Sequence, residues 1–240
     1  MTELSRRHLL GVAGVAGLAP TLAGAGATAA AAPTASTYAK TNLTSDQALA
    51  LLKEGNRRFI SDQPAEVTID RARRLAIAKS QTPFAVLVSC SDSRVGPEQL
   101  FGRGLGELFI VRNAGNTAAS TQSIGSIEFA VGVLGVPLVV VLGHERCGAV
   151  VAAVDVVQKN ALFPGSIGRM VEPIVPAALE VRGAAGDMVE NACRANIRRT
   201  VTQLRTSVEP IMLEPQKQGK LKVVGAYYDL DTGAVEFFDD

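Results

Sequence analysis

Histidine and cysteine are scarce in this chain of 240 residues, which has two histidines and three cysteines. His8 lies in an N-terminal segment that we expect to be removed, so the mature protein keeps only His144. A Ser-His-Asp or Cys-His hydrolase would have to use that one histidine as its base, and His144 is better explained as a metal ligand. Three cysteines would allow one disulfide and one spare thiol. Two of them are assigned to a metal below, and Cys193 is expected to be a buried, small apolar residue inside a helix.

Neither sign of charge is in excess, because the chain has 24 basic and 23 acidic residues. Removal of residues 1–32 takes away Glu3, Arg6 and Arg7, and 24 less two basic and 23 less one acidic residues leave 22 of each. A net charge near zero gives no reason to expect nucleic acid or an acidic membrane as a partner. The expected partner is a small molecule.

The N-terminus also lacks a hydrophobic run long enough to favour a membrane anchor, since its apolar stretch is short, rich in glycine and broken at Pro20. Ser5–Leu10 reads Ser-Arg-Arg-His-Leu-Leu, which is typical of a twin-arginine signal, and small residues with A-x-A cleavage sites follow. We therefore expect a signal peptide at 1–32, a linker at 33–41 and one domain at 42–240. The protein would be exported already folded, to the periplasm or the cell exterior, with no stable membrane insertion after cleavage.

Short continuous apolar runs alternate with helical patterns along the rest of the chain. The runs 83–90, 108–112 and 138–142 are typical of strands buried on both faces of a parallel sheet. A hairpin is expected near the C-terminus, with strands at 223–230 and 234–238. The expected helices cover about residues 44–59, 69–80, 123–134, 149–157, 167–182 and 186–209. This order predicts an α/β fold with a mostly parallel sheet of four or five strands flanked by helices.

Two segments carry the candidate chemistry, Cys90-Ser-Asp92-Ser-Arg94 and His144-Glu-Arg-Cys147. Each follows a predicted parallel strand, and ligands in such sheets gather beyond the carboxyl ends of the strands. Two cysteines and one histidine form a Cys2His zinc site that keeps a fourth position open for water. No nearby cysteine or histidine supplies the fourth ligand that a closed structural site needs. The pattern therefore predicts a catalytic zinc site, with Asp92 and Arg94 close enough to orient the water.

Four segments of the sequence resemble, in order, the signature segments of the β-class carbonic anhydrases, and of their plant-like subgroup in particular. They are Gln81–Arg94, Arg112–Asn116, Ser126–Val131 and Gly143–Gly148. The resemblance extends from about residue 43 to residue 238, which is nearly the whole expected mature chain. It implies the sheet and helices of that family.

The resemblance implies that Cys90, His144 and Cys147 bind one zinc ion per chain. The implied reaction is the reversible hydration of carbon dioxide to bicarbonate and a proton, by attack of zinc-bound hydroxide. Asp92 would accept a hydrogen bond from that hydroxide, and Arg94 would hold the carboxylate of Asp92 in place. In some family members the aspartate instead binds zinc directly in a resting form, and that alternative stays open.

Five further residues match family positions near the substrate. By the resemblance, the Gln81 side chain would donate a hydrogen bond to a substrate oxygen, and the backbone N–H of Gly148 would face the substrate. Phe109, Ala114 and Phe129 would form an apolar pocket for the gas, with Phe129 in place of a tyrosine that is frequent there. Without the resemblance, Gln81 would be a polar turn residue and Gly148 a close-packing residue at a helix start.

The resemblance also implies a homodimer or a larger homo-oligomer, since family members bury their active sites at a dimer interface. Two other functions stay open on the same residues. One is a hydrolase of carbonyl sulfide or carbon disulfide, which are linear molecules that would meet the same zinc site. The other is a non-catalytic module that binds zinc or bicarbonate without turnover.

Overall fold

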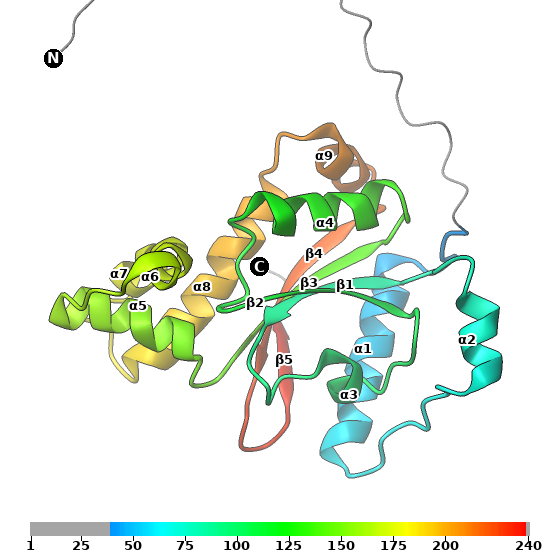
Figure 1. The fold of residues 1–240 in the computed structure, drawn as a ribbon, viewed down its shortest axis with the longest axis horizontal. Helices are drawn as coiled ribbons and strands as arrows, with labels where there is room; N and C mark the ends of the chain where they lie inside the picture. Colours follow the sequence, from blue (N-terminus) through cyan, green and yellow to red (C-terminus); the bar gives the residue numbers. More distant parts are fainter. Residues whose placement is uncertain (1–38, 239–240) are drawn as a thin grey trace, which may run out of the picture. The chain divides into compact units, whose positions relative to one another are not determined.

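The computed structural model describes residues 39–238, which form one sheet with helices on both faces (Figure 1). The signal expected at 1–32, and most of the linker expected at 33–41, lie outside these residues. Within them, no helix is both long enough and apolar enough to cross a membrane.

The sheet has five strands in the order β2-β1-β3-β4-β5. They are β1 (Ala85–Cys90), β2 (Leu108–Asn113), β3 (Leu138–His144), β4 (Lys222–Tyr228) and β5 (Val235–Phe238). The first four are parallel, and β5 is antiparallel to β4, with which it forms the expected hairpin. Every residue of β1 and β3 is buried, as continuous apolar runs predict for strands in the middle of a parallel sheet. The predicted fold class is confirmed.

Helices cover both faces of this sheet. They are α1 (Ser45–Ile60), α2 (Arg71–Ile77), α3 (Pro97–Leu100), α4 (Thr121–Gly132), α5 (Gly148–Lys159), α6 (Gly165–Val171), the 3-10 helix η1 (Glu172–Ile174), α7 (Val175–Glu180), α8 (Met188–Arg205) and α9 (Pro210–Lys217). Buried residues of α1 and α3 pack on one face of the sheet, and those of α4, α8 and α9 pack on the other (Figure 1). Alternate residues of each central strand therefore contribute to two separate cores.

Two of the predicted helices are wrong in extent, and prolines explain the difference. The helix expected at 167–182 is three shorter pieces, α6, η1 and α7, with Pro173 at the start of the 3-10 helix and Pro176 at the start of α7. The helix expected at 186–209 ends at Arg205, and Pro210 begins the separate helix α9. Proline lacks a backbone N–H, so it cannot donate the hydrogen bond that continues a helix, whereas in the first turn that N–H has no helical partner anyway.

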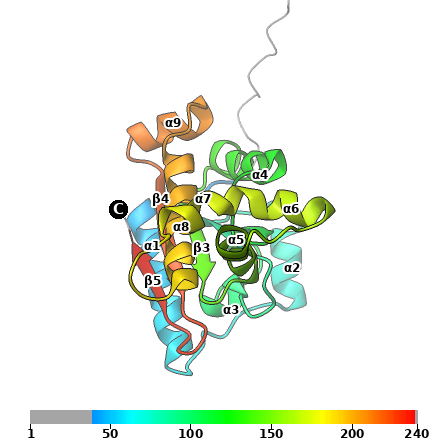
Figure 2. The same cartoon turned by 90° about the vertical axis from the view of Figure 1, so that its left-hand side faces the viewer.

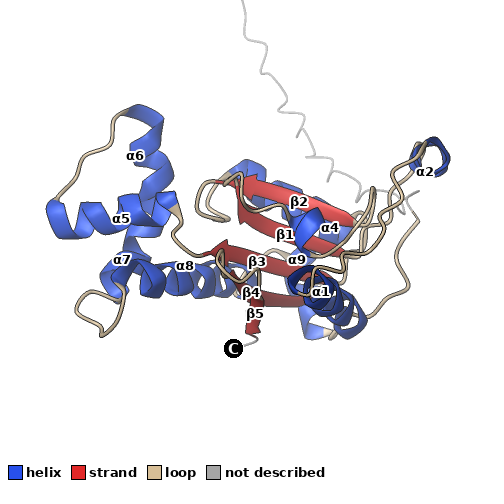
Figure 3. Ribbon diagram, turned by 90° about the horizontal axis from the view of Figure 1, so that it is seen from below, coloured by secondary structure: helices blue, strands red, loops and turns tan. Residues whose placement is uncertain are grey.

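The sheet brings the two ligand-bearing segments together at one edge. β1 and β3 are hydrogen-bonded neighbours, with Ser89 opposite Leu142, so that Cys90 and His144 both end their strands at the carboxyl edge. Beyond this edge lie α5, α6 and α7, as Figure 3 shows from below and Figure 2 shows end on. The convergence predicted from the sequence is therefore found in the structure.

Candidate metal centre

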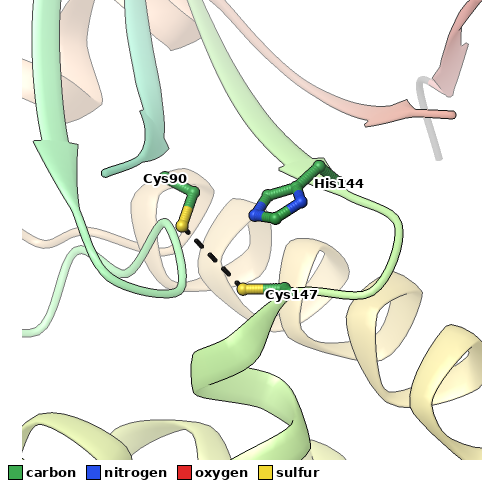
Figure 4. A group of neighbouring side chains, drawn as sticks. All are labelled: Cys90, His144 and Cys147. Atoms are coloured by element: carbon green, nitrogen blue, oxygen red, sulfur yellow. Dashed lines mark hydrogen bonds between the residues drawn. The ribbon is translucent and has the colours of Figure 1, made fainter. Parts of the chain in front are cut away.

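Three ligand atoms converge at the carboxyl edge of the sheet. The Cys90 and Cys147 sulfurs and a ring nitrogen of His144 all lie within 4.8 Å of one another, and the three side chains are buried. Cys90 ends β1, His144 ends β3, and Cys147 is the N-cap residue of α5. Figure 4 shows the two sulfurs and the imidazole ring pointing toward one another. In the described part of the chain, this is the cluster of histidine, cysteine and acidic side chains that is able to hold a metal ion.

One of the two ring nitrogens of His144, Nε2, is available to bind a metal, because the other is hydrogen-bonded to the backbone. Its Nδ1 lies 2.8 Å from the carbonyl oxygen of Glu145, and this contact requires Nδ1 to carry the proton and donate it. Nε2 is then left with a lone pair, and it is buried without a hydrogen-bond partner. A buried nitrogen without a partner is costly unless a ligand occupies the space beside it. Metal-binding histidines commonly have this arrangement, in which the second nitrogen donates to a carbonyl.

The two thiols have a spacing that suits one shared ion. Their sulfurs are 3.9 Å apart, and two sulfurs bound tetrahedrally at about 2.3 Å from zinc would be about 3.8 Å apart. The hydrogen bond between them lowers the pKa of the Cys90 thiol and raises that of Cys147, because one proton serves both sulfurs. The backbone N–H of Gly115 also donates to the Cys90 sulfur at 3.4 Å. Soft thiolates and a neutral imidazole are ligands that zinc prefers, so the residues present fit this metal.

Cys193 lies outside the cluster, as predicted. It is in the middle of α8 and only 2% exposed, and its burial raises the pKa of its thiol to about 12. A thiol that stays protonated is a poor metal ligand. The structure therefore agrees with the prediction that Cys193 is a core residue.

Asp92 and Arg94 form a two-pronged ion pair next to the ligand cluster. Arg94 Nε donates to Asp92 Oδ1 at 2.9 Å, and Arg94 Nη2 donates to Asp92 Oδ2 at 2.8 Å. Asp92 Oδ2 is also 3.9 Å from the unpartnered Nε2 of His144. The guanidinium holds the pKa of Asp92 well below its usual range, so the carboxylate is ionised at any pH near neutrality. The aspartate therefore borders the metal position while it is bound to the arginine.

Three residues to which the sequence analysis gave no role, Arg112, Gly115 and Asn196, hold the Cys90 segment in place. Arg112 of β2 donates to the carbonyl oxygens of Cys90 and Asp92, at 2.8 and 2.7 Å. Asn196 of α8 donates to the carbonyl of Gly115, the residue whose N–H contacts the Cys90 sulfur. Asn196 did carry a signal, because it is a polar residue on the apolar face of its helix.

Gly148 is the first residue of α5 and is exposed. A Cβ added to it would meet no heavy atom within 4 Å, so close packing does not account for a glycine here. Of the three predicted pocket residues, Phe109 and Phe129 are in ring contact, with centroids 6.4 Å apart. Ala114 directly precedes Gly115 and packs against the core, while Phe129 is 40% exposed.

A single chain keeps Phe109 away from the ligands, because Phe109 pairs with Val86 near the amino end of β1. Gln81 is kept away as well. It precedes the amino end of β1, whereas Cys90 is at the carboxyl end of the same strand. A strand of six residues is about 20 Å long, so the two residues are at opposite edges of the sheet.

The chain is similar to known proteins over most of its length. A protein-family model described as carbonic anhydrase matches residues 85–235. Carbonic anhydrase 2 of Mycobacterium tuberculosis is 40% identical over 182 residues, which cover 76% of this chain and 87% of that protein. Among solved structures, the Coccomyxa β-carbonic anhydrase in complex with acetazolamide has a TM-score of 0.60 at 27% identity, over 80% of this chain and 88% of that one. A tetrameric β-carbonic anhydrase from Sordaria macrospora has the same fold, with a TM-score of 0.62 at 23% identity, over 69% and 85% of the two chains.

The family model spans more than half of the chain, and the mycobacterial relative is similar over most of its own length. The Cys90, His144 and Cys147 cluster lies within the matched segment, at the edge of a sheet shared with the solved structures. The chain is therefore an enzyme of the carbonic anhydrase family, in its β class.

Proposed function

We propose that this chain catalyses the reversible hydration of carbon dioxide to bicarbonate and a proton, with one zinc ion held by Cys90, His144 and Cys147. The observation that carries the proposal is the buried, unpartnered Nε2 of His144, which lies close to both ligand sulfurs and 3.9 Å from Asp92. This set offers three protein ligands, so a fourth position is left for water. When bound, zinc supplies Lewis acidity that makes a nucleophile available from water at moderate pH.

Asp92 orients the nucleophile. Its carboxylate is an acceptor next to the metal position, and Arg94 both fixes its direction and keeps it ionised. An ionised acceptor receives the remaining hydrogen of the nucleophile and turns an oxygen lone pair toward the carbon of the substrate. The pairing with Arg94 favours this role over direct binding of Asp92 to the metal.

The start of α5 favours the anionic product. Gly148 follows the ligand Cys147 directly, and no side chain caps the first N–H groups of this helix of 12 residues. These free donors and the positive end of the helix dipole stabilise a negative charge such as that of bicarbonate. The contact between Phe109 and Phe129 supplies an apolar surface that suits an uncharged gas.

We propose a homodimer or larger homo-oligomer as the working form. β2 is one of the two edge strands of the described sheet, and Phe129, which touches Phe109 of β2, is 40% exposed. Because Gln81 is at the wrong end of β1 for its own site, it would contact substrate only in the site of a neighbouring copy. Its presence supports the plant-like subgroup. Light scattering on the purified protein gives the oligomer size, and a monomer with full activity would contradict both points.

The deciding experiment is stopped-flow measurement of carbon dioxide hydration by the zinc-loaded protein. Zinc-dependent turnover that acetazolamide inhibits is the expected result, since that compound is bound in the Coccomyxa structure. Cys90→Ser is the matched control, because an alcohol is a poorer zinc ligand than a thiolate. Stoichiometric zinc without turnover would indicate a binding module, and preferential turnover of carbonyl sulfide or carbon disulfide would indicate a hydrolase.

Proton release should limit this reaction. His144 is assigned to the metal and His8 to the signal, so no histidine of the mature chain is left to shuttle protons. We expect kcat to rise with the concentration of imidazole buffer at fixed pH. A kcat that is independent of buffer would show that an internal proton relay exists.

We also propose export by the twin-arginine route, on the basis of Ser5–Leu10 and the short apolar stretch that follows. The protein would then work in the periplasm or outside the cell. Replacement of Arg6 and Arg7 by lysine should keep the precursor inside the cell. Fractionation with an antibody to the folded domain measures this, and normal export of the double variant would contradict the proposal.

A further inference from the structure

Arg112 has no role in the reaction proposed above, yet its guanidinium donates to the backbone of Cys90 and Asp92. Nε donates to the carbonyl oxygen of Cys90 at 2.8 Å, and Nη2 donates to the carbonyl oxygen of Asp92 at 2.7 Å. Both of these hydrogen bonds are given to backbone carbonyls, and within residues 39–238 no carboxylate pairs with the guanidinium. The residue belongs to β2, the strand next to β1, and lies opposite Ser89.

The ion pair of Asp92 with Arg94 does not by itself place Asp92 in the site. Both residues belong to the same turn, so their pairing fixes one relative to the other and not the turn relative to the sheet. The Arg94 side chain is also 52% exposed, and exposed ion pairs contribute little stability. Some other contact has to hold the turn against the strands.

Contacts with β2 meet this need. The backbone N–H of Ser91 donates to the carbonyl of Asn113 at 3.1 Å, which continues the pairing of β1 with β2 by one residue. Arg112 then binds the carbonyls on both sides of Ser91 through one rigid, planar group. The two bonds fix the direction of the peptide groups that follow Cys90 and Asp92, on either side of the Ser91–Asp92 peptide. They therefore set where the Asp92 side chain leaves the backbone.

We propose that Arg112 is a positioning residue for the reaction. It holds the Cys90–Asp92 turn so that the Asp92 carboxylate stays on Arg94, beside the metal position and not on it. The assignment rests on the proposed function. Asp92 Oδ2 is only 3.9 Å from His144 Nε2, so a small rotation of the turn would be enough to bring the carboxylate to the metal.

The test compares Arg112→Met and Arg112→Lys in the full chain. Methionine keeps an apolar stem and removes both donors, whereas lysine keeps the charge but is a point donor that cannot reproduce the fork. The matched control is Arg205→Met, because Arg205 also donates twice to a backbone carbonyl, that of Val223, at 2.9 and 2.7 Å. Val223 is near the amino end of β4, at the edge of the sheet away from the metal.

Two readouts are needed, and one does not depend on turnover. The first is the visible absorption of the protein loaded with Co²⁺, which reports the number and geometry of metal ligands. The second is kcat/KM for carbon dioxide with zinc. For Arg112→Met we expect stoichiometric metal, altered cobalt bands and a loss of about 10–100-fold in kcat/KM, in line with other residues that orient metal ligands. Arg112→Lys should have a kcat/KM between those of the wild type and Arg112→Met. Arg205→Met should keep both the wild-type cobalt bands and the wild-type turnover.

Wild-type cobalt bands and turnover in Arg112→Met would overturn the proposal, and so would equal changes in Arg205→Met. If the methionine variant does not fold, wild-type bands and turnover in Arg112→Lys overturn it in the same way. Altered bands in a protein whose wild type hydrates no carbon dioxide would leave the positioning role intact and reject the proposed function. In a chain that already carries Asp92→Asn, Arg112→Met should lower kcat/KM little further, because no carboxylate is left to move toward the metal.

Discussion

The two turns that carry the proposed metal ligands are built differently, although they lie side by side. The turn after β1 contributes one ligand, Cys90, and is fixed to β2 mainly by the Arg112 side chain. The turn after β3 contributes His144 and Cys147 and is fixed by backbone, since the N–H of Glu145 donates to the carbonyl of Tyr228 and helix α5 begins after Cys147. Glu145 also accepts a hydrogen bond from the N–H of Leu230.

The difference separates two tasks. The second turn holds buried ligands in a strand and a helix that are part of the core. The first turn carries the partly exposed pair of Asp92 and Arg94, whose direction matters more than its burial. Damage to the second turn should therefore remove the metal, whereas damage to the first turn beyond Cys90 should leave the metal but impair its use.

The largest effect is expected in the second turn, from Cys147→Ser. Loss of this thiolate should abolish stoichiometric zinc binding and lower kcat/KM by more than about 10³-fold, because an alcohol is a poor zinc ligand. Metal analysis of the purified protein measures this. Cys193→Ala is the control and should keep its zinc, since Cys193 is a buried cysteine outside the cluster. Full zinc in Cys147→Ser would show that Cys147 is not a ligand.

In the first turn, Asp92→Asn should keep zinc and lower kcat/KM by about 10²-fold. An amide is not an anionic acceptor and cannot pair with Arg94 in the same way. The control is Asp231→Asn, which removes the exposed carboxylate that Arg146 of the second turn contacts. That variant should have normal zinc and normal turnover. Equal losses in the two variants would mean that the turns do not differ in the way described.

A smaller effect, on stability, is expected from Asn196 of α8, which binds the Gly115 carbonyl next to the first turn. Asn196→Ala removes the donor to the Gly115 carbonyl, a bond of 2.8 Å between buried groups, and should lower the free energy of unfolding by about 1–3 kcal/mol. Urea unfolding of the zinc-loaded protein measures this. Gln203→Ala removes a comparable bond to the Ala118 carbonyl at a half-buried position and should cost less. If Gln203→Ala lowered the free energy of unfolding more than Asn196→Ala does, Asn196 would not be a specific support of the site.

The smallest effect is on stability at acid pH. Arg94 lowers the pKa of Asp92 in the folded protein. The contribution of the pair is therefore complete above the unfolded-state pKa of about 4, and it is lost as the pH falls through the lower folded value. The difference in unfolding free energy between the wild type and Asp92→Asn should be constant above about pH 5 and shrink below it. A difference that grows on acidification would contradict the lowered pKa.

The convergence of Cys90, His144 and Cys147 could be predicted from the sequence because the signals are local. Cys90 and His144 end continuous apolar runs, and such runs identify buried parallel strands whose carboxyl ends meet. The sheet and the Cys-His-Cys cluster followed from that reasoning. The resemblance to the β-class enzymes then supplied the reaction and the expected roles of the neighbouring residues, which the structure places but does not test.

The supports of the site were missed because their partners are distant in the chain. Arg112 contacts a carbonyl 22 residues away and Asn196 one 81 residues away, and no local periodicity contains such pairs. The helix ends near Pro173 and Pro210 were missed for another reason. Apolar spacing continues across these prolines, but their missing N–H groups end or restart the helix.

Cys147 follows Cys90 by 57 positions in the chain, so a metal bound at this site would also affect the stability of the fold. An ion bound at both sulfurs joins the ends of a long loop, as a covalent cross-link does. A cross-link over a loop of this length removes unfolded-state entropy that corresponds to about 4 kcal/mol at 25 °C. The unfolded chain keeps these ligands far apart and binds the ion weakly, so most of the binding energy adds to the stability of the folded state. Removal of the ion by a chelator would then loosen the contact between β1 and β3, at the centre of the sheet.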